Sequence, residues 1–365
     1  MDQQTATALA EVAAIQAIRK LLAQHGRGVD RADAGTIAQC YHDDAEVDYG
    51  FFTGPASELA AILATAQSGG PITLHRAAHS WIRRTGEDEA LGETYVTAYA
   101  EAPADDGSPR QRLICGRYLD RFTRREGVWK IAHRRYVLDV PLSHEGSFAP
   151  PPLGEFAHHF PTGGHGRADP GMALLASARA AAFSSRKEAP AMNAPSPDLI
   201  DRTISTQQLA TLTAAYCRGV DRTDEALLKS LFHEDSVVTS GAFNGNGQAF
   251  AVEICKIVRD SFEQAFHSTA NQWFEIDGDE AIGESYAVAA VTIGGEGDAR
   301  TGVLTGGRYI DRFSRRDGVW KFAERHFVCD WTLQQPVAGD EDGLVAALPL
   351  RGQQGPDDPV YRFWK

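Results

Sequence analysis

A long internal repeat constrains this chain more than any other feature. Residues 116–132 read GRYLDRFTRREGVWKIA, and residues 307–323 read GRYIDRFSRRDGVWKFA. Thirteen of these 17 positions are identical, and the four differences keep the chemical type of the side chain. At the same offset of 191 residues, the RGVDR of 27–31 recurs at 218–222. A repeat of this length indicates a tandem duplication, so we expect two copies of one domain.

The segments that follow each copy differ from the repeat in composition. A chain of 365 residues is the usual length for two domains. Stretches rich in Pro, Gly, Ser and Ala separate the copies and indicate an arm and a linker. We predict a first domain with its arm at 1–175, a linker at 176–200 and a second domain at 201–365. The second copy ends in GPDDPVYRFWK, whose Asp-Pro matches Asp169-Pro170 and whose aromatic end is expected to dock on a neighbouring domain.

Each copy begins with helical patterns and ends with strand patterns. Apolar residues spaced three and four apart predict a leading helix in EVAAIQAIRKLLAQH and in TQQLATLTAAYC, and two further helical segments follow in each copy. The rest of each copy alternates β-branched and aromatic residues with polar ones, which is typical of strands. EGVW and DGVW predict tight hairpin turns between the last two strands. Helices followed by antiparallel strands indicate an α+β domain.

Composition limits the kinds of molecule that the protein is expected to bind and the compartment in which it is expected to work. The formal net charge of -13 disfavours binding to nucleic acid. The N-terminus lacks a basic leader, and no apolar run approaches the roughly 18 residues of a spanning helix, so we expect no membrane association. The cysteines form no CxxC pair and are expected to be reduced thiols, neither a disulfide frame nor a zinc site, in a cytoplasmic protein. They are Cys40, Cys115, Cys217, Cys255 and Cys329.

Three motifs recur together in both copies: RGVDR-x-D after the first helix, His-x-Asp/Glu-Asp after the second, and the GRY-x-DRF…GVWK-x-A hairpin. Their combination resembles the SnoaL-like families of the nuclear-transport-factor-2-like superfamily. The resemblance implies two tandem cone-shaped α+β barrels, each a curved antiparallel sheet wrapped around three helices, with one pocket in each cone. Families it resembles include scytalone dehydratase, bile acid 7α-dehydratase, hexachlorocyclohexane dehydrochlorinase, polyketide cyclases and formaldehyde-releasing lyases. The small subunits of ring-hydroxylating dioxygenases share the cone without chemistry of their own.

The resemblance also implies a pair of catalytic residues. In the dehydratases and the dehydrochlorinase, an aspartate at the end of the first helix pairs with a histidine that leads into a strand. Matched to this sequence, the aspartate is Asp30 in the first copy and Asp221 in the second. The histidine is His79 in the first copy, and its counterpart in the second is Asn271. The resemblance therefore implies that the second copy has lost its base.

The chemistry of such a pair needs no metal and no cofactor. A neutral imidazole accepts a proton near neutral pH, and a buried carboxylate fixes its tautomer and stabilises the imidazolium. The alternatives without catalysis are that Asp30 only caps its helix and that His79 is a buried structural histidine. The spacing His75-x3-His79 suggests zinc, but the glutamate of HExxH is absent and the segment continues as a strand, so we predict no metal.

Further residues are assigned around this pair. Arg134 matches the dehydrochlorinase arginine and is assigned to stabilise a departing anion, although a surface ion pair would explain it equally. Tyr49 is a candidate acid and His75 a candidate second pocket group. The expected substrate-binding aromatics are Trp81, Phe52 and Tyr95, for which plain core packing is the alternative. A possible second site comprises Asp221, His267, Asn271 and Tyr216.

The interpretation of the whole sequence is a lyase that uses no cofactor. We expect base-catalysed elimination of water, a halide or formaldehyde from a small apolar, aromatic or cyclic compound. The first copy would be catalytic, and the second a structural partner paired with it as a pseudo-dimer within a homo-oligomer. The alternatives are an isomerase or cyclase using the same pair, a non-catalytic subunit like those of the dioxygenases, and a module that only binds an apolar ligand.

Overall fold

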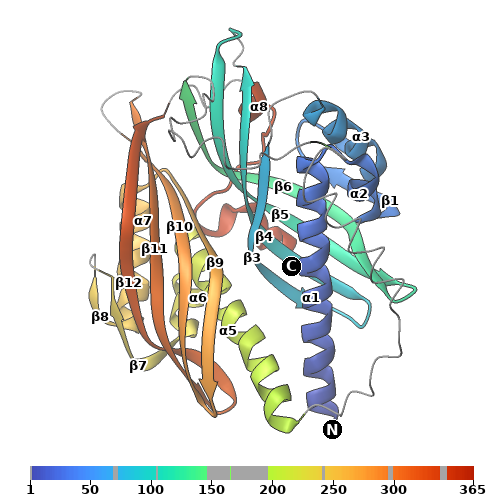
Figure 1. Cartoon of the computed structure of the whole chain (residues 1–365). Helices are drawn as coiled ribbons and strands as arrows, with labels where there is room; N and C mark the ends of the chain where they lie inside the picture. The colour runs from blue at the N-terminus through green and yellow to red at the C-terminus, as the bar shows by residue number, and fades with distance from the viewer. Residues whose placement is uncertain are drawn as a thin grey trace, which may run out of the picture.

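The computed structural model describes residues 2–68, 73–103, 106–145, 165, 196–240, 243–294, 299–337 and 343–365. Two α+β domains stand side by side, each with a curved sheet wrapped around its helices (Figure 1). The predicted fold class is therefore confirmed. The predicted linker and the arm with Asp169-Pro170 lie outside the described residues, apart from 196–200, and helix α5 of domain 2 already begins at Pro197.

Domain 1 contains three helices and a six-stranded sheet. Asp2 caps the first helix by accepting from the N–H of Thr5, and Asp33 caps the second through Thr36. The elements are α1 (Gln3–Asp30), α2 (Ala34–Gln39), β1 (Tyr41–Asp48), β2 (Thr53–Pro55), α3 (Ala56–Gln67), β3 (Leu74–Arg84), β4 (Glu89–Pro103), β5 (Pro109–Arg125) and β6 (Val128–Glu145).

Domain 2 repeats this order element by element. Ser196 caps its first helix and Asp224 its second. The elements are α5 (Pro197–Asp221), α6 (Glu225–Leu231), β7 (Phe232–Thr239), β8 (Asn244–Asn246), α7 (Gly247–Ser261), β9 (Gln264–Asp277), β10 (Glu280–Gly294), β11 (Arg300–Arg316) and β12 (Val319–Pro336).

Both sheets are mixed, which corrects the expectation of wholly antiparallel sheets. The orders are β2-β1-β6-β5-β4-β3 and β8-β7-β12-β11-β10-β9. The acidic stretch after the second helix, for which the sequence predicts no element, forms β1, and β1 runs parallel to β6. The predicted hairpin turns are confirmed, because Glu126 and Gly127 both have positive φ (52° and 78°), as do Asp317 and Gly318.

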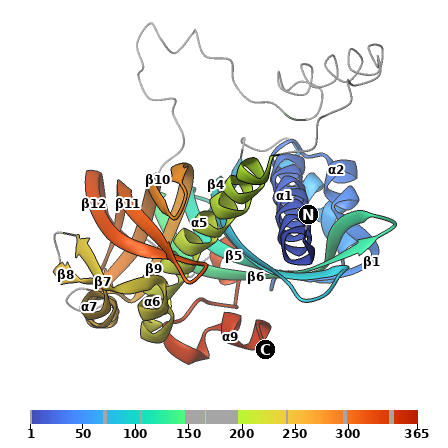
Figure 2. The same cartoon turned by 90° about the horizontal axis from the view of Figure 1, so that it is seen from below.

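The two domains pack against each other through a small core of their own. Phe266 and Ala290 from domain 2 join Tyr95, Val140 and Leu142 from domain 1 in this core. The C-terminal arm, Gly343–Lys365, comprises α8 (Gly343–Ala346), η3 (Gly355–Asp357) and α9 (Pro359–Phe363). It lies against the outer face of the domain 1 sheet, so the arm of one copy does dock on the other (Figure 2).

A buried ion network joins the arm to both domains. Arg117 of β5 contacts Glu93, Asp139 and Asp358 at 2.8 to 2.9 Å, and all four side chains are at most 1% exposed. Arg222, at the end of α5, also contacts Asp139 and Asp358, at 3.2 and 2.8 Å. Because buried charges are tolerated only when they are paired, this network makes the arm part of the domain contact.

No helix among the described residues is both long and apolar enough to cross a membrane.

Candidate active site

The end of helix α1 and the start of strand β3 bring Asp30 and His75 together. The Nδ1 atom of His75 lies 2.7 Å from Oδ1 of Asp30. The backbone N–H of His75 and the hydroxyl of Thr73 also donate to the Asp30 carboxylate, each at 3.0 Å. With a carboxylate as acceptor, the neutral form of His75 carries its proton on Nδ1 and has its lone pair on Nε2. The contact with Asp30 therefore fixes the tautomer of the neutral imidazole.

The expected pairing of Asp30 with His79 is wrong about the histidine. His79 accepts a hydrogen bond at Nδ1 from the backbone N–H of Thr269 in domain 2, at 3.1 Å, and its ring packs on Tyr95 at 4.2 Å. It lies at the domain contact. Burial lowers the pKa of His79 to about 3, although the nearby Asp221 acts in the opposite direction. An imidazole with so low a pKa is a poor base at neutral pH.

An irregularity in β3 separates the two histidines. Residues four apart on a regular strand share one face of the sheet. Here the register with β4 shifts between Ala77, which pairs with Val96, and Ser80, which pairs with Thr94. Two residues therefore oppose one, as in a β-bulge, and the alternation of faces is inverted beyond it. His75 faces the helices inside the cone, whereas His79 faces domain 2.

The interior of domain 1 is unusually polar beside this pair. Arg134 of β6 forms two hydrogen bonds of 2.7 Å with Asp120 and lies 3.7 Å from the centre of the Tyr118 ring. The Arg134–Asp120 pair is fully buried, so the surface ion pair that was the alternative for Arg134 is not what forms. Burial alone would lower the pKa of Arg134, but the Asp120 carboxylate more than offsets this and raises it well above its usual range.

Tyrosine hydroxyls extend this polar interior. Tyr49 stacks on Tyr136 with ring centres 5.8 Å apart, and its Oη has no hydrogen-bond partner among the described residues. Tyr41 is bonded through its hydroxyl to Nε2 of His25 at 3.0 Å. Burial, with Arg134 and His75 nearby, holds the pKa of His25 well below its usual range, so His25 is the neutral acceptor and Tyr41 the donor.

Domain 2 contains the same aspartate–histidine pair, formed by Asp221 and His267 of the possible second site. His267 Nδ1 lies 2.6 Å from Oδ1 of Asp221, and the backbone N–H of His267 donates to Oδ2 at 2.9 Å. The expectation that the second copy lacks the histidine of the pair is therefore wrong, because His267 takes this place. The side chain of Asn271 lies outside the described part of the structure. The signal available in the sequence was that a histidine stands at both positions, 75 and 267.

The two interiors differ in polarity although both keep the pair. Arg325 and Asp311 repeat the buried arginine–aspartate pair at 2.8 Å. Tyr216, in the place of His25, lies beside Arg325 and stacks on Phe250. At the positions of the domain 1 residues Tyr41, Tyr49 and Tyr136, domain 2 has Phe232, Ser240 and Phe327. Domain 2 thus retains the aspartate–histidine pair and has Tyr216 and Tyr309 beside Arg325, but it lacks counterparts of these three tyrosines.

The expected substrate-binding aromatics fall on two surfaces. Phe52 packs against the core of domain 1. Trp81 instead packs against Trp364 of the arm, with ring centres 5.6 Å apart, and Arg218 of domain 2 lies over its ring. Tyr95 packs on Phe266 at 5.2 Å. Trp81 and Tyr95 therefore belong to the domain contact, not to the cone interior beside Asp30.

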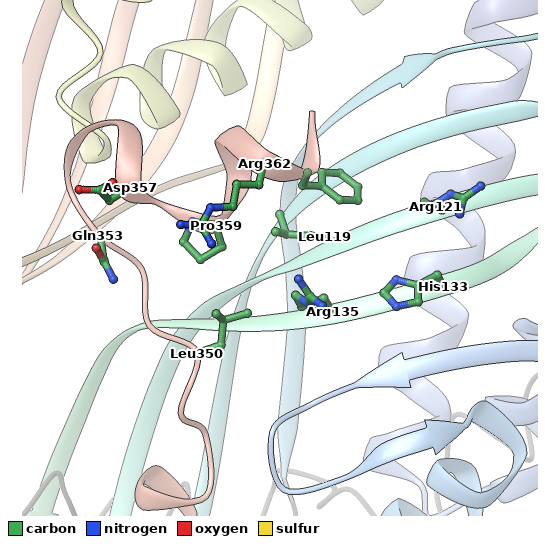
Figure 3. A pocket seen from close by; sticks show the side chains of 10 residues that line it. Leu119, Arg121, His133, Arg135, Leu350, Gln353, Asp357, Pro359 and Arg362 are labelled. Carbon is green, nitrogen blue, oxygen red and sulfur yellow. The ribbon is translucent and has the colours of Figure 1, made fainter. Parts of the chain in front are cut away.

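Besides a cavity of about 250 Å³ between the domains, lined among others by Leu113, Leu142, Leu304 and Leu333, two larger cavities lie at domain and arm contacts. One, of about 430 Å³, lies between the arm and the outer face of the domain 1 sheet, and Figure 3 shows Arg121, His133, Arg135 and Arg362 around it. The other, of about 440 Å³, lies between α1, β3, α5 and α6. Neither of these two cavities is lined by Asp30 or His75.

Two helix-filled cones, each with an aspartate–histidine pair at the end of the first helix, define the class of protein. The SnoaL-like domain model matches residues 10–135 and again residues 201–326. Since the two matches cover more than half of the chain, this protein belongs to the SnoaL-like domain family, as two copies in tandem.

Solved structures resemble one domain at a time. The crystal structure of LinA is 25% identical over 38% of this chain and 94% of its own, with a TM-score of 0.35. A LinA-type3 hexachlorocyclohexane dehydrochlorinase from Novosphingobium barchaimii LL02 is 24% identical over 38% and 94%, with a TM-score of 0.34. A putative scytalone dehydratase from Novosphingobium aromaticivorans is 21% identical over 36% and 88%, with a TM-score of 0.33. No curated protein matches. These likenesses do not establish an activity.

Proposed function

We propose that domain 1 is a cofactor-independent lyase that eliminates a leaving group from a small, mostly apolar ring compound. The observation that carries this proposal is the contact between Asp30 and His75, with three hydrogen-bond donors converging on one buried carboxylate. Such a carboxylate orients the imidazole and balances the charge that it acquires when it accepts a proton.

The elimination needs one proton acceptor and, for some leaving groups, one donor. Nε2 of His75 takes a proton from carbon, the C–H electron pair becomes the new double bond, and the leaving group departs with its bonding electrons. A halide leaves as the anion, and the buried Arg134 guanidinium is the nearby positive charge. A hydroxyl must be protonated as it leaves, and the hydroxyl of Tyr49 in the same domain has no hydrogen-bond partner among the described residues.

The tyrosines are the reason for assigning the reaction to domain 1. Both domains have the aspartate–histidine base and the buried arginine, but only domain 1 surrounds them with Tyr41, Tyr49 and Tyr136. A leaving oxygen requires a proton donor, and Tyr49, whose buried hydroxyl has no partner among the described residues, is replaced in domain 2 by Ser240, a poor acid. We therefore propose that domain 2 contributes mainly by packing on domain 1.

The experiment compares matched variants on a substrate panel. Cyclic β-hydroxy ketones and halogenated cyclohexanes are incubated with the protein, and loss of water or of hydrogen halide is followed by mass spectrometry. His75→Ala or Asp30→Asn should lower kcat at least about a hundredfold, while the matched His267→Ala should keep most of it. His79→Asn serves as the control for the alternative base. If His79→Asn abolishes turnover and His75→Ala does not, the assignment fails.

The rival functions give different results in the same experiment. An isomerase or cyclase would use the same base but give a product of unchanged mass. A binding module would hold its compound without converting it and would tolerate Asp30→Asn. A dioxygenase-type subunit would copurify with a larger iron-containing partner.

A further inference from the structure

Strands β5 and β6 present basic side chains on the outer face of the domain 1 sheet. Arg121 of β5 pairs with His133 of β6, and Leu119 pairs with Arg135, so these side chains share one face. The C-terminal arm passes over this face and adds Arg362 (Figure 2). The cavity of about 430 Å³ between arm and sheet therefore has three guanidinium groups and an imidazole in its lining (Figure 3).

The carboxylates near this cavity neutralise only part of its positive charge. Asp48 of β1 contacts Nε of Arg135 at 3.0 Å, and both side chains are partly exposed. Arg121 and Arg362 form no ion pair with another described residue. The described residues that line the cavity include one acidic side chain, Asp357, which lies at the opposite end from Arg121 (Figure 3). The end of the cavity at Arg121 therefore carries an unpaired positive charge.

His133 adds a hydrogen-bonding group at this end of the cavity. It pairs with Arg121 on one side and with Glu46 of β1 on the other, and Glu46 is not among the residues that line the cavity. Burial, with Arg135 and Arg121 nearby, lowers the pKa of His133, although Asp120 acts in the opposite direction. The imidazole is therefore neutral near pH 7 and can donate one hydrogen bond.

Domain 2 has an acid where domain 1 has this histidine. Its residues at the positions of the three basic side chains of β5 and β6 are Arg312, Glu324 and His326. Glu324 contacts Nε2 of His326 at 2.6 Å and a guanidinium nitrogen of Arg312 at 3.6 Å. The chain thus supplies its own carboxylate to the arginine of domain 2, whereas domain 1 has none at the equivalent position.

We propose that the cavity under the arm binds a small organic anion, a carboxylate or a phosphate ester with an apolar body. Arginine forms paired hydrogen bonds with the oxygens of both groups, which is why the shared chemistry is an oxyanion. The ligand is organic because Leu119, Leu350, Pro359 and Phe363 give the cavity apolar walls. A volume of about 430 Å³ is sufficient for one small organic molecule.

This site is separate from the proposed catalytic centre. Arg134 stands between His133 and Arg135 on β6, so its side chain points to the opposite face of the sheet, where it pairs with Asp120 inside the cone. The proposed anion site therefore does not depend on the proposed function, and it is tested by binding.

The test titrates the full chain with fluorinated probes, and fluorine NMR of the probe gives its Kd. The probes are para-fluorobenzoate and para-fluorophenyl phosphate, and para-fluorobenzyl alcohol is the neutral control. The salt concentration is held at about 0.15 M, which screens general attraction between charges. At least one anion should bind with a Kd below about 1 mM, and the alcohol more weakly. If neither anion reaches this affinity, or if the alcohol binds as tightly as both, the proposal is overturned.

Matched variants place the bound anion. Arg121→Gln and Arg362→Gln should each weaken its binding about tenfold or more, because each removes a charge-assisted hydrogen bond. His133→Glu introduces the carboxylate that Glu324 supplies in domain 2, and it should abolish binding. Arg312→Gln is the matched control and should bind like the wild type. The three arginines are exposed, so the far-UV circular dichroism of their variants should be unchanged.

Three results with these variants would show that the anion binds elsewhere and would overturn the proposal. They are binding that neither Arg121→Gln nor Arg362→Gln weakens, binding that persists in His133→Glu, and binding that Arg312→Gln weakens as much as Arg121→Gln does. If the variants behave as expected, the probe that binds more tightly identifies the anionic group as carboxylate or phosphate.

Discussion

Protonation of His79 should weaken the domain contact in acid. His79 is 5% exposed, accepts from the Thr269 N–H, and has its pKa lowered to about 3 by burial. In the unfolded chain its pKa is about 6.5. The unfolded state therefore binds a proton that the folded state does not, so stability is complete above pH 6.5 and falls as the pH decreases toward 3. Between pH 7 and pH 4.5 this one group should lower the free energy of unfolding by about 2.5 kcal/mol.

The His79→Asn variant isolates this effect. Its amide oxygen can accept the Thr269 N–H but does not titrate, and the lost packing on Tyr95 should cost about 1 kcal/mol at pH 7. Urea unfolding followed by tryptophan fluorescence gives the apparent free energy of unfolding of both proteins at pH 7 and pH 4.5. The variant should lose about 2.5 kcal/mol less than the wild type over this interval. Equal losses would show that His79 can be protonated in the folded protein and would refute the argument.

Other predictions concern stability and use the repeat as an internal control. Arg117→Met should lower the free energy of unfolding by about 3–5 kcal/mol because it leaves buried carboxylates unpaired. The equivalent Arg308→Met, in a partly exposed pair, should lower it by less than about 1 kcal/mol. Thermal unfolding compares the two variants, and similar losses would contradict the role of burial. Tyr41→Phe should cost about 1–3 kcal/mol in the same assay, because it leaves Nε2 of His25 without a donor, and an unchanged Tm would show that this bond is not needed. Truncation after Arg351 removes the Asp358 carboxylate, which contacts Arg117 of domain 1 and Arg222 of domain 2. The shortened protein should have a lower Tm and be cleaved faster by protease. An unchanged Tm would show that Asp358 does not hold the domains together.

Local patterns predicted most of the architecture. The spacing of apolar residues located the long helices, and the glycines of EGVW and DGVW located turns that require positive φ at Gly127 and Gly318. The pairing of β1 with β6 was not predictable in the same way. β1 and β6 are parallel partners although they lie far apart in the sequence. The acidic stretch that forms β1 also has little strand propensity of its own.

The sequence predicted which residue types form the site, but not which histidine contacts Asp30. Asp30 was identified correctly as one member of a buried pair, and a histidine four residues from the right one was chosen as its partner. His75 and His79 belong to the same strand, and only the bulge at Ala77–Ser80 decides which of them faces the helices. No local sequence signal marks that bulge, because a bulge is defined by the pairing of β3 with β4, which lies elsewhere in the chain.

The sequence by itself determined that this protein consists of two copies of one domain, because the duplicated residues are still identical at many positions and share the same local periodicity. Only the tertiary structure decided that the two copies have different environments. Equivalent ion pairs are buried on one sheet and partly exposed on the other, since α5, β9 and the C-terminal arm cover Arg117 and Glu93 of domain 1 and leave Arg308 and Glu284 of domain 2 in contact with solvent. That asymmetry depends on how two curved sheets meet in space, which residues near one another in the chain do not specify.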